Sequence, residues 1–343
     1  MTIEFDLGDA IEDGVNFLQN NCGAFFNTVG DSLEYLGKTI EAFLLIIPPW
    51  LVIAVFVGLA FWRISYRFAI FTALALLLIL YGFANGFWEL SLLAIWLAVL
   101  SIWRNRVTYV ISAISYLYLP YLLYELGKPV GYWDATMITL GLVLSSTLIS
   151  LIIGIPLGIC MAKSRYVEYV VRPILDLMQT MPAFVYLIPV TMLFSIGYSV
   201  GIIATIIFAM PPAVRLTHLG IRQVNRELLE AGRSFGCTYW QLLFKVQLPN
   251  AMPSIMTGVN QCLMMSLSMV IIASMVGVEG LGQLVNGSLN TLNISLGFKS
   301  GLAVVLLAVV LDRITESFGR SQLDKRKSRI EWIKERLHNL QEN

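Results

Sequence analysis

Residues 230–250, EAGRSFGCTYWQLLFKVQLPN, form a polar stretch between two strongly apolar segments of the chain. Asn225 lies just before this stretch and can cap the start of a short helix. Gly236 suits the left-handed conformation that ends a helix, and Thr238 with Gln241 has the spacing of a capping box. The stretch is therefore predicted to form two short helices joined at a glycine.

The composition of the whole chain indicates an integral membrane protein. Of 343 residues, 57% are hydrophobic and 13% are charged, against about 25% charged in ordinary soluble domains. There are two histidines and four cysteines, without a CxxC or HExxH pattern, so neither a metal site nor a disulfide framework is predicted. The cysteines are Cys22, Cys160, Cys237 and Cys262.

Apolar runs long enough to cross a bilayer recur along the chain, and each needs about 20 residues, or fewer where neighbouring helices bury its ends. The chain is expected to be an all-α polytopic helical bundle with about nine spans, the third and seventh of them short. The nine predicted spans are residues 42–62, 68–85, 88–103, 107–126, 134–161, 176–196, 198–214, 250–276 and 297–317.

The distribution of charge predicts which ends of these spans face the cytoplasm, because loops rich in Lys and Arg remain inside. Cations follow every odd-numbered span, beginning at Arg63, Arg104, Lys163, Arg215 and Arg320. The first 41 residues hold Lys38 against eight acidic residues. The N-terminus is therefore expected outside and the C-terminus in the cytoplasm, which requires an odd number of spans.

Both ends of the chain carry apolar residues at helical spacing. Residues 1–41 lack the basic start of a signal peptide and are expected to form an amphipathic extracytoplasmic helix on the outer membrane face, without a specific docking residue. Residues 319–343 are expected to form a cytoplasmic amphipathic helix. The tripeptide GKT at 37–39 is not a nucleotide-binding loop, because Ser32 occupies the position of its required glycine. The N-terminal stripe is Ile11, Val15, Leu18, Cys22, Phe25, Val29, Leu33 and Leu36, and the C-terminal one is Ile330, Ile333, Leu337 and Leu340.

The polar stretch resembles the "EAA" coupling loop of ABC importer permeases. Gly232 stands where a second alanine is usual, and Val246 replaces an isoleucine. Without the resemblance, an amphipathic loop resting on lipid headgroups is an equally good interpretation. A DNA-reading helix-turn-helix is disfavoured, because the membrane holds both ends of the loop. The motif is carried by Glu230, Ala231, Gly232, Gly236, Val246, Leu248 and Pro249.

Further segments are similar to the glycine betaine/proline betaine branch of this family: GIPLGI at 154–159, LDLMQTMPAFVYLIP at 175–189 and IFAMPPAVRLTHLGIRQV at 207–224. The resemblance spans residues 134–317 and implies a MetI-like type I importer transmembrane domain at 134–318, with its coupling loop at 215–249. Residues 42–133 would then hold N-terminal spans with an inserted hairpin near 88–126. Asn225 departs from the family pattern, in which proline is usual.

This resemblance implies an osmoprotective transport subunit rather than an enzyme. ATP and Mg would be bound by a separate ATPase subunit, in two copies, and this chain would bind no cofactor. A second copy of the chain and an extracytoplasmic substrate-binding protein would complete the complex, embedded in membrane lipid and without nucleic acid. The cargo would be glycine betaine, proline betaine or a related quaternary amine, with choline, carnitine and histidine as open alternatives.

The predicted eighth span carries polar or soft residues on one helical face, which makes them candidates for a transport pathway. For each residue taken singly, a polar contact between helices is the favoured explanation. Asp176 and Asp312 lie near predicted cytoplasmic ends and are expected to be structural. The candidate pathway residues are Gln179, Thr180, Tyr186, Thr205, Asn260, Met264 and Ser268.

Two other classes of membrane protein are less well supported. A self-powered secondary transporter or channel would place ionisable residues near the membrane midplane, and the fifth to ninth predicted spans have none there. A membrane enzyme would need a nucleophile with its base, or a set of metal ligands. The sequence contains no such group of residues.

Overall fold

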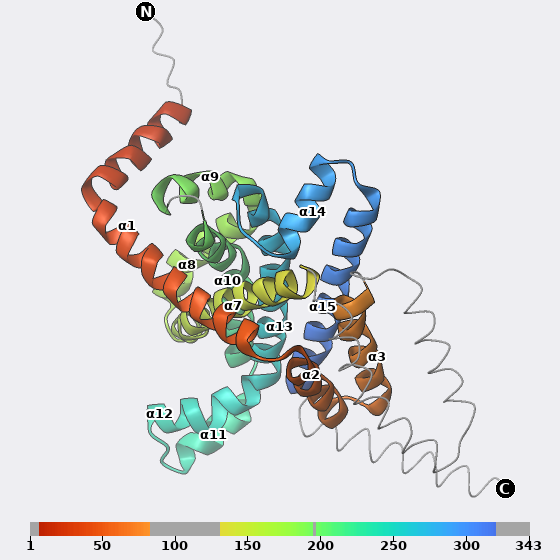
Figure 1. The fold of residues 1–343 in the computed structure, drawn as a ribbon. Helices are drawn as coiled ribbons and strands as arrows, with labels where there is room; N and C mark the ends of the chain where they lie inside the picture. The colour runs from red at the N-terminus through yellow and green to blue at the C-terminus, as the bar shows by residue number, and fades with distance from the viewer. Residues whose placement is uncertain (1–6, 83–130, 195–196, 320–343) are drawn as a thin grey trace, which may run out of the picture.

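The computed structural model describes residues 7–82, 131–194 and 197–319, and within these ranges it contains helices and no strand. Figure 1 shows the helices gathered in a bundle, with α11 (Arg226–Ser234) and α12 (Tyr239–Leu242) projecting at one end. The predicted all-α fold is confirmed for these ranges. The predicted hairpin near 88–126 and the tail beyond Gly319 lie outside the described residues.

The centre of the bundle is formed by three long helices: α7 (Tyr132–Lys163), α10 (Tyr198–Arg222) and α13 (Leu248–Ala273). Glycines allow these helices to approach closely, as is common in membranes. A methyl group at Gly158 of α7 would lie 2.6 Å from the carbonyl oxygen of Val214 in α10. A methyl at Gly258 of α13 would lie 3.3 Å from the carbonyl oxygen of Pro212 in α10. The backbone itself therefore sets the spacing at both crossings.

Two buried hydrogen bonds tie α7 to the C-terminal half of the bundle. Thr147 Oγ1 donates to Ser266 Oγ of α13 at 3.0 Å. Thr139 Oγ1 accepts from the backbone N–H of Leu281 at 2.8 Å. Because a polar group buried in a membrane protein needs a partner, these serine and threonine residues hold the helices in register.

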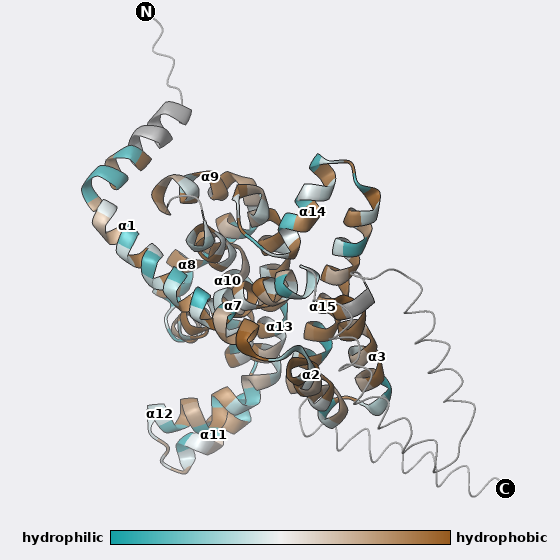
Figure 2. Ribbon diagram, in the orientation of Figure 1, coloured by the Kyte–Doolittle hydropathy of each residue, from teal (hydrophilic) through white to brown (hydrophobic). Residues whose placement is uncertain are grey.

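Four helices are long and apolar enough to cross a membrane, and up to six spans result if each of two sharply bent helix pairs counts as one, within the described ranges. The four include α15 (Ile294–Gly319) and a continuous stretch from Tyr239 to Val276. Figure 2 shows the apolar character of these helices along most of their length. The expected count of nine is not confirmed.

The predicted uninterrupted spans at 42–62 and 176–196 are wrong, because each contains a sharp bend. Helices α1 (Leu7–Ile46) and α2 (Pro49–Arg63) meet at 98°. Helices α8 (Arg165–Thr180) and α9 (Ala183–Phe194) meet at 105°. A proline lies at each break, Pro48 in the first and Pro182 in the second, and proline lacks the N–H that would continue the helix.

The N-terminal segment forms helix α1 as predicted, and only part of the predicted apolar stripe is covered: Val15 is buried and Leu33 packs against the main apolar core. Phe26 packs edge-on against Phe194 of α9, with ring centroids 5.4 Å apart. A methyl at Gly37 would clash with the ring of Tyr198 in α10. Among the other members of the stripe, Leu18, Cys22, Phe25 and Leu36 are exposed. The placement of α1 on the outer membrane face stays a prediction.

Two shorter helices complete the described bundle: the first falls within the predicted span at 68–85, and the second was not anticipated from the apolar runs. Residues Tyr66–Leu77 form α3, which continues as a π-helical turn to Gly82 and packs beside α2. Residues Leu281–Asn290 form α14, which follows a turn with Gly277 at φ 90° and Gly280 at φ 120°. Both glycines adopt left-handed backbone conformations that disfavour side chains. The turn reverses the chain between the two long spans α13 and α15.

Candidate functional site

The polar loop between α10 and α13 begins with a capped helix, as predicted. Asn225 Oδ1 accepts from the backbone N–H of Glu227 at 3.1 Å, which satisfies one of the free amides at the start of α11. The carboxylate of Glu227 lies in the first turn, where negative charge suits the helix dipole. The loop therefore begins at a defined residue.

Helix α11 ends at the predicted glycine. Gly236 has φ 77°, and its N–H donates to the carbonyl of Arg233 at 2.9 Å. The N–H of Cys237 donates to the carbonyl of Gly232 at 3.1 Å. These two bonds form a Schellman motif, which satisfies carbonyls at the end of the helix while the left-handed glycine turns the chain.

The second helix of the loop also begins as predicted, but it does not end before the membrane. A capping box joins Thr238 and Gln241, with the Thr238 N–H donating to Gln241 Oε1 at 2.9 Å. Helix α12 then continues through a π-helical turn, Leu243–Gln247, directly into α13. Pro249 and Pro253 lie within this continuous stretch of 38 residues. The expected separate second helix is thus the first turn of a membrane span.

The two arms of the loop touch at Gly232. A methyl group there would lie 2.7 Å from Leu242 Cδ1 and 3.7 Å from Val246 Cγ2. Leu242 is buried, and so is its neighbour Leu243. The glycine that stands in place of the usual alanine therefore lets α11 fold closely against α12 and the π-helical turn.

The outer surface of the loop, here called the aromatic face, is formed by Phe235, Tyr239, Trp240 and Phe244. The side chain of Phe235 is 89% exposed and that of Trp240 is 63% exposed. The rings of Trp240 and Phe244 stack with centroids 5.9 Å apart. Lys163 Nζ lies 3.5 Å from the centre of the Tyr239 ring. Exposed clusters of large apolar side chains mark binding surfaces.

The residues of the coupling motif divide between this surface and the interior. Glu230 and Ala231 are exposed on α11, and Pro249 is exposed at the start of α13. Gly232 is buried and Leu248 is half-buried. The structure thus brings the motif together on one elbow. Its role in coupling stays a prediction.

Ion pairs fasten α8 to the C-terminal half of α10, next to the loop. Arg215 of α10 pairs with Asp176 of α8. Arg222 Nη1 donates to both carboxylate oxygens of Glu168, at 3.0 and 3.1 Å. Asp176 therefore has the structural contact expected of it, and α8 is held beside the helix that leads into the loop.

Asn260 links two helices. Its Nδ2 donates to Asp312 Oδ1 of α15 at 2.8 Å, which gives Asp312 a structural contact too. Met264 is half-buried against the main apolar core. Ser268 is exposed and donates to the carbonyl of Met264 at 3.1 Å. Of these three candidates, Asn260 makes the kind of interhelical contact that was the alternative to a pathway role.

The other pathway candidates lie on three different helices. Thr205 is buried in α10 and donates to the carbonyl of Gly201 at 2.6 Å. Gln179 is half-buried and Thr180 exposed at the end of α8, and Tyr186 belongs to α9. The pathway assignment stays a prediction for all seven residues.

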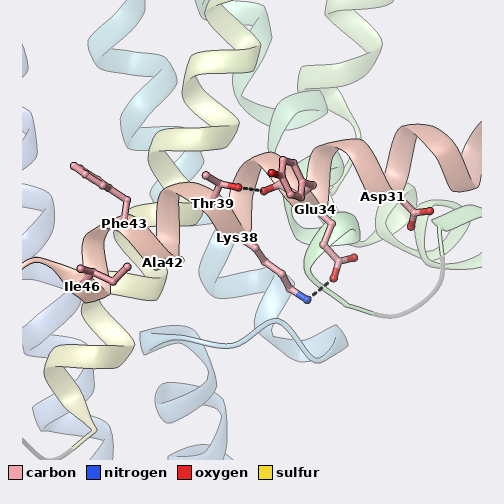
Figure 3. Close-up of a pocket in the computed structure, with 8 residues that line it drawn as sticks. Asp31, Glu34, Lys38, Thr39, Ala42, Phe43 and Ile46 are labelled. Carbon is pink, nitrogen blue, oxygen red and sulfur yellow. Dashed lines mark hydrogen bonds and ion pairs between the residues drawn. The ribbon is translucent and has the colours of Figure 1, made fainter.

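A shallow groove lies along α1, on the side shown in Figure 3. Lys38 Nζ pairs with Glu34 Oε1 at 2.6 Å, and Thr39 Oγ1 donates to the carbonyl of Tyr35 at 2.6 Å. Both interactions stay within the helix. In the part of the chain that the structure describes, no group of three or more His, Cys, Asp or Glu residues could hold a metal ion.

Comparison with known families identifies the part of the chain around this loop. Residues 154–323 match the family model described as "Binding-protein-dependent transport system inner membrane component". The match begins in α7, includes the whole loop from Asn225 to Pro249, and ends just beyond α15.

Individual relatives extend the comparison. The chain is 54% identical over 191 residues to the glycine betaine/proline betaine transport system permease protein ProW of Escherichia coli, covering 56% of this chain and 54% of that protein. It is also 54% identical over 189 residues to the glycine betaine/carnitine transport permease protein GbuB of Listeria monocytogenes. This match covers 55% of this chain and 67% of GbuB. The chain thus spans about half the length of ProW.

One relative matches almost from end to end. The glycine betaine transport system permease protein OpuAB of Bacillus subtilis is 39% identical over 311 residues, which cover 91% of this chain and 93% of that protein. Together with the matched domain and the helical bundle, this similarity shows that the chain belongs to the family of binding-protein-dependent transport system inner membrane components.

Proposed function

We propose that this chain is the permease subunit of an ATP-driven importer that moves glycine betaine, proline betaine or a related quaternary amine across the cell membrane for osmoprotection. The observation that carries the proposal is the loop itself, a closed elbow with an exposed aromatic face, continuous with a membrane span. Such a surface suits a protein partner that pushes on the span.

The energy source would be a separate ATPase subunit that binds ATP and Mg. Its closure would displace the aromatic face, and because Gly232 and Leu242 hold the two arms together, the displacement would pass into α13 as a rigid movement. One chain has one such loop. Two ATPase copies would therefore require two copies of the permease in a symmetric complex.

The cargo follows from the relatives and from the chemistry of the spans. ProW, GbuB and OpuAB are all named as glycine betaine permeases. Residues 198–214 of α10 and 248–273 of α13 contain no charged side chain. A methylated ammonium is attracted by aromatic and weakly polar walls through cation–π contacts and needs no carboxylate. An extracytoplasmic binding protein would supply the high affinity, so the spans can bind cargo weakly and release it.

The proposed orientation places the N-terminus outside and the aromatic face in the cytoplasm. Lys163, which contacts Tyr239 of that face, belongs to one of the cation clusters that the positive-inside rule places there. Helix α1 would then lie toward the extracytoplasmic side of the membrane.

The test is uptake of radiolabelled glycine betaine into liposomes that contain the chain, its ATPase and its binding protein. Uptake should require ATP on the side of the liposome membrane that carries the ATPase subunit, and the binding protein on the opposite side. Uptake driven by an ion gradient without ATP would rule out the importer class. ATP-driven uptake of amino acids such as histidine, without any quaternary amine, would rule out the cargo while leaving the class intact.

A further inference from the structure

The turn between α2 and α3 holds an arginine between aromatic rings. Arg63 ends α2, and its guanidinium carbon lies 4.4 Å from the ring centre of Phe318 in α15 and 5.3 Å from that of Trp62. Its Nε is buried and has no hydrogen-bond partner among the described residues. The aromatic contacts fix the plane of the guanidinium without using its N–H groups.

A second arginine lies on the other side of the same turn. Arg67 Nε donates to the hydroxyl of Tyr66 at 3.1 Å. Ser65 Oγ accepts from the N–H of Phe68 at 3.3 Å, so the cap at the start of α3 fixes the turn. Within the ranges 7–82, 131–194 and 197–319, neither Arg63 nor Arg67 forms an ion pair. The described residues therefore supply no acidic partner for either cation.

The surroundings of this turn are those of a membrane boundary. Trp62 is 75% exposed and Tyr66 is 59% exposed. Figure 1 shows α2 and α3 beside α15, and Phe318 lies in the last turn of α15. A methyl at the next residue, Gly319, would lie 3.0 Å from Cβ of Met256 in the first half of α13. The turn thus lies at the end of the bundle from which the coupling loop projects.

We propose that Trp62, Arg63, Tyr66 and Arg67 bind the phosphate of an anionic phospholipid, such as phosphatidylglycerol, in the cytoplasmic leaflet. Arginine donates two parallel N–H bonds to a phosphate, and exposed Trp and Tyr rings favour the headgroup region. Two cations that lack an ion-pair partner among the described residues favour an anionic over a zwitterionic lipid at the surface by about tenfold or more. The site depends on the proposed membrane orientation but not on the transported cargo.

The bound phosphate would lie beside the end of α15 as well as on the turn. Because Arg63 stacks on Phe318, a lipid held by Arg63 and Arg67 would fasten the α2–α3 pair to the last turn of α15. The lipid would add to apolar packing that already joins the pair to α15, where Ala75 packs with Val310 and Ile314.

The test measures the lipid that remains bound to the full-length chain. Membranes containing equal amounts of phosphatidylglycerol and phosphatidylcholine are extracted with detergent, the protein is purified, and both lipids are quantified by mass spectrometry. We expect phosphatidylglycerol to be enriched in the purified protein. The double variant Arg63→Gln/Arg67→Gln should lose most of that enrichment, by about tenfold.

The matched control is Arg165→Gln/Arg172→Gln, which removes the same charge from exposed positions of α8. It should keep the enrichment, and all variants should elute as one species in size-exclusion chromatography. The variant Arg63→Lys/Arg67→Lys should retain part of the phosphatidylglycerol enrichment. Lysine keeps the positive charge but lacks the planar guanidinium that donates two parallel N–H bonds to a phosphate.

Four results would overturn the proposal. The first is equal retention of both lipids by the unchanged chain, and the second is an equal loss of phosphatidylglycerol in the Arg63/Arg67 variant and the α8 control. The third is displacement of the bound lipid by inorganic phosphate. The fourth is unchanged lipid content in the Arg63/Arg67 variant together with weaker binding of the ATPase subunit. The third would indicate a free-anion site and the fourth a protein contact. Transport is not part of the readout, so failure here leaves the proposed function untouched.

Discussion

Asn260 of α13 and Asp312 of α15 are joined by a hydrogen bond of 2.8 Å between two helices long enough to cross the membrane. The bond gives a partly buried carboxyl a partner that water does not readily replace. Asn260 therefore holds α15 against α13, the helix that is continuous with the polar loop.

Asn260→Leu should destabilise the protein, because it leaves Asp312 without this partner. We expect a loss of about 1 kcal/mol, within the range measured for hydrogen bonds between membrane helices. The measurement is thermal unfolding of the purified chain in detergent. Ser268→Ala is the control, since Ser268 is exposed and bonds only within its own helix. Unchanged stability combined with a changed preference among quaternary amines would instead support a pathway role for Asn260.

Gly236→Val should abolish uptake, because the φ of 77° at this position is strained for a β-branched residue. The expected cost is about 1–2 kcal/mol, located at the elbow. Gly236→Asn should retain most activity, since asparagine tolerates the left-handed region and a Cβ here meets no atom within 4 Å. The amount of each variant in the membrane is measured alongside ATP-driven uptake. Normal transport by the valine variant would show that the elbow need not keep this shape.

Glu230→Lys should also abolish uptake while leaving the protein in the membrane. Glu230 is exposed on α11, so reversal of its charge alters the partner surface and not the interior. Ser234→Ala is a suitable control on the same helix, because its hydroxyl donates to the carbonyl of Glu230. Wild-type uptake by the lysine variant would contradict a role for this carboxylate in coupling.

Trp240→Ala should weaken binding of the ATPase subunit by about 30-fold, the size of effect found for buried aromatic residues at interfaces. The affinity of the purified subunits is measured in detergent. Tyr166→Ala removes another highly exposed aromatic side chain, outside the loop, and should have little effect. If both variants bind equally well, the aromatic face rests on lipid headgroups and does not contact the ATPase.

Gly158→Ala should destabilise the bundle, since the added methyl would meet the backbone oxygen of Val214, which cannot move aside easily. Overpacking of this kind costs about 1–3 kcal/mol. Gly58→Ala is the matched control, because a Cβ at Gly58 has no atom within 4 Å. Thermal unfolding of the two variants should differ clearly. Equal melting temperatures would mean that α7 and α10 separate readily at this crossing.

The parts of the structure that follow from local rules could be predicted from the sequence. The cap at Asn225, the turn at Gly236 and the capping box at Thr238 each depend on atoms within about five residues. The apolar runs likewise located α7, α10, α13 and α15. These features need no knowledge of distant contacts.

The bends could be predicted only in part: a break or kink is expected at Pro182 as at other prolines of the spans, but proline alone does not decide where a helix breaks. Pro48 and Pro182 lie at sharp breaks, whereas Pro156, Pro211 and Pro253 lie inside continuous helices. Which outcome occurs depends on whether neighbouring helices hold the chain straight. The bond between Asn260 and Asp312 is hidden for the same reason, since it joins residues that come together only in the folded bundle.

The unbroken run from Tyr239 to Val276 acts mechanically as a beam. At 1.5 Å per residue, its 38 residues measure about 57 Å. If the beam pivots near one end, a tilt of about 5° at the aromatic face moves the opposite end by about 5 Å, nearly one helical turn. That far end leads directly into the glycine turn before α14. If the loop is on the cytoplasmic side, as proposed, a small displacement of the aromatic face would be enlarged at the opposite end of the bundle.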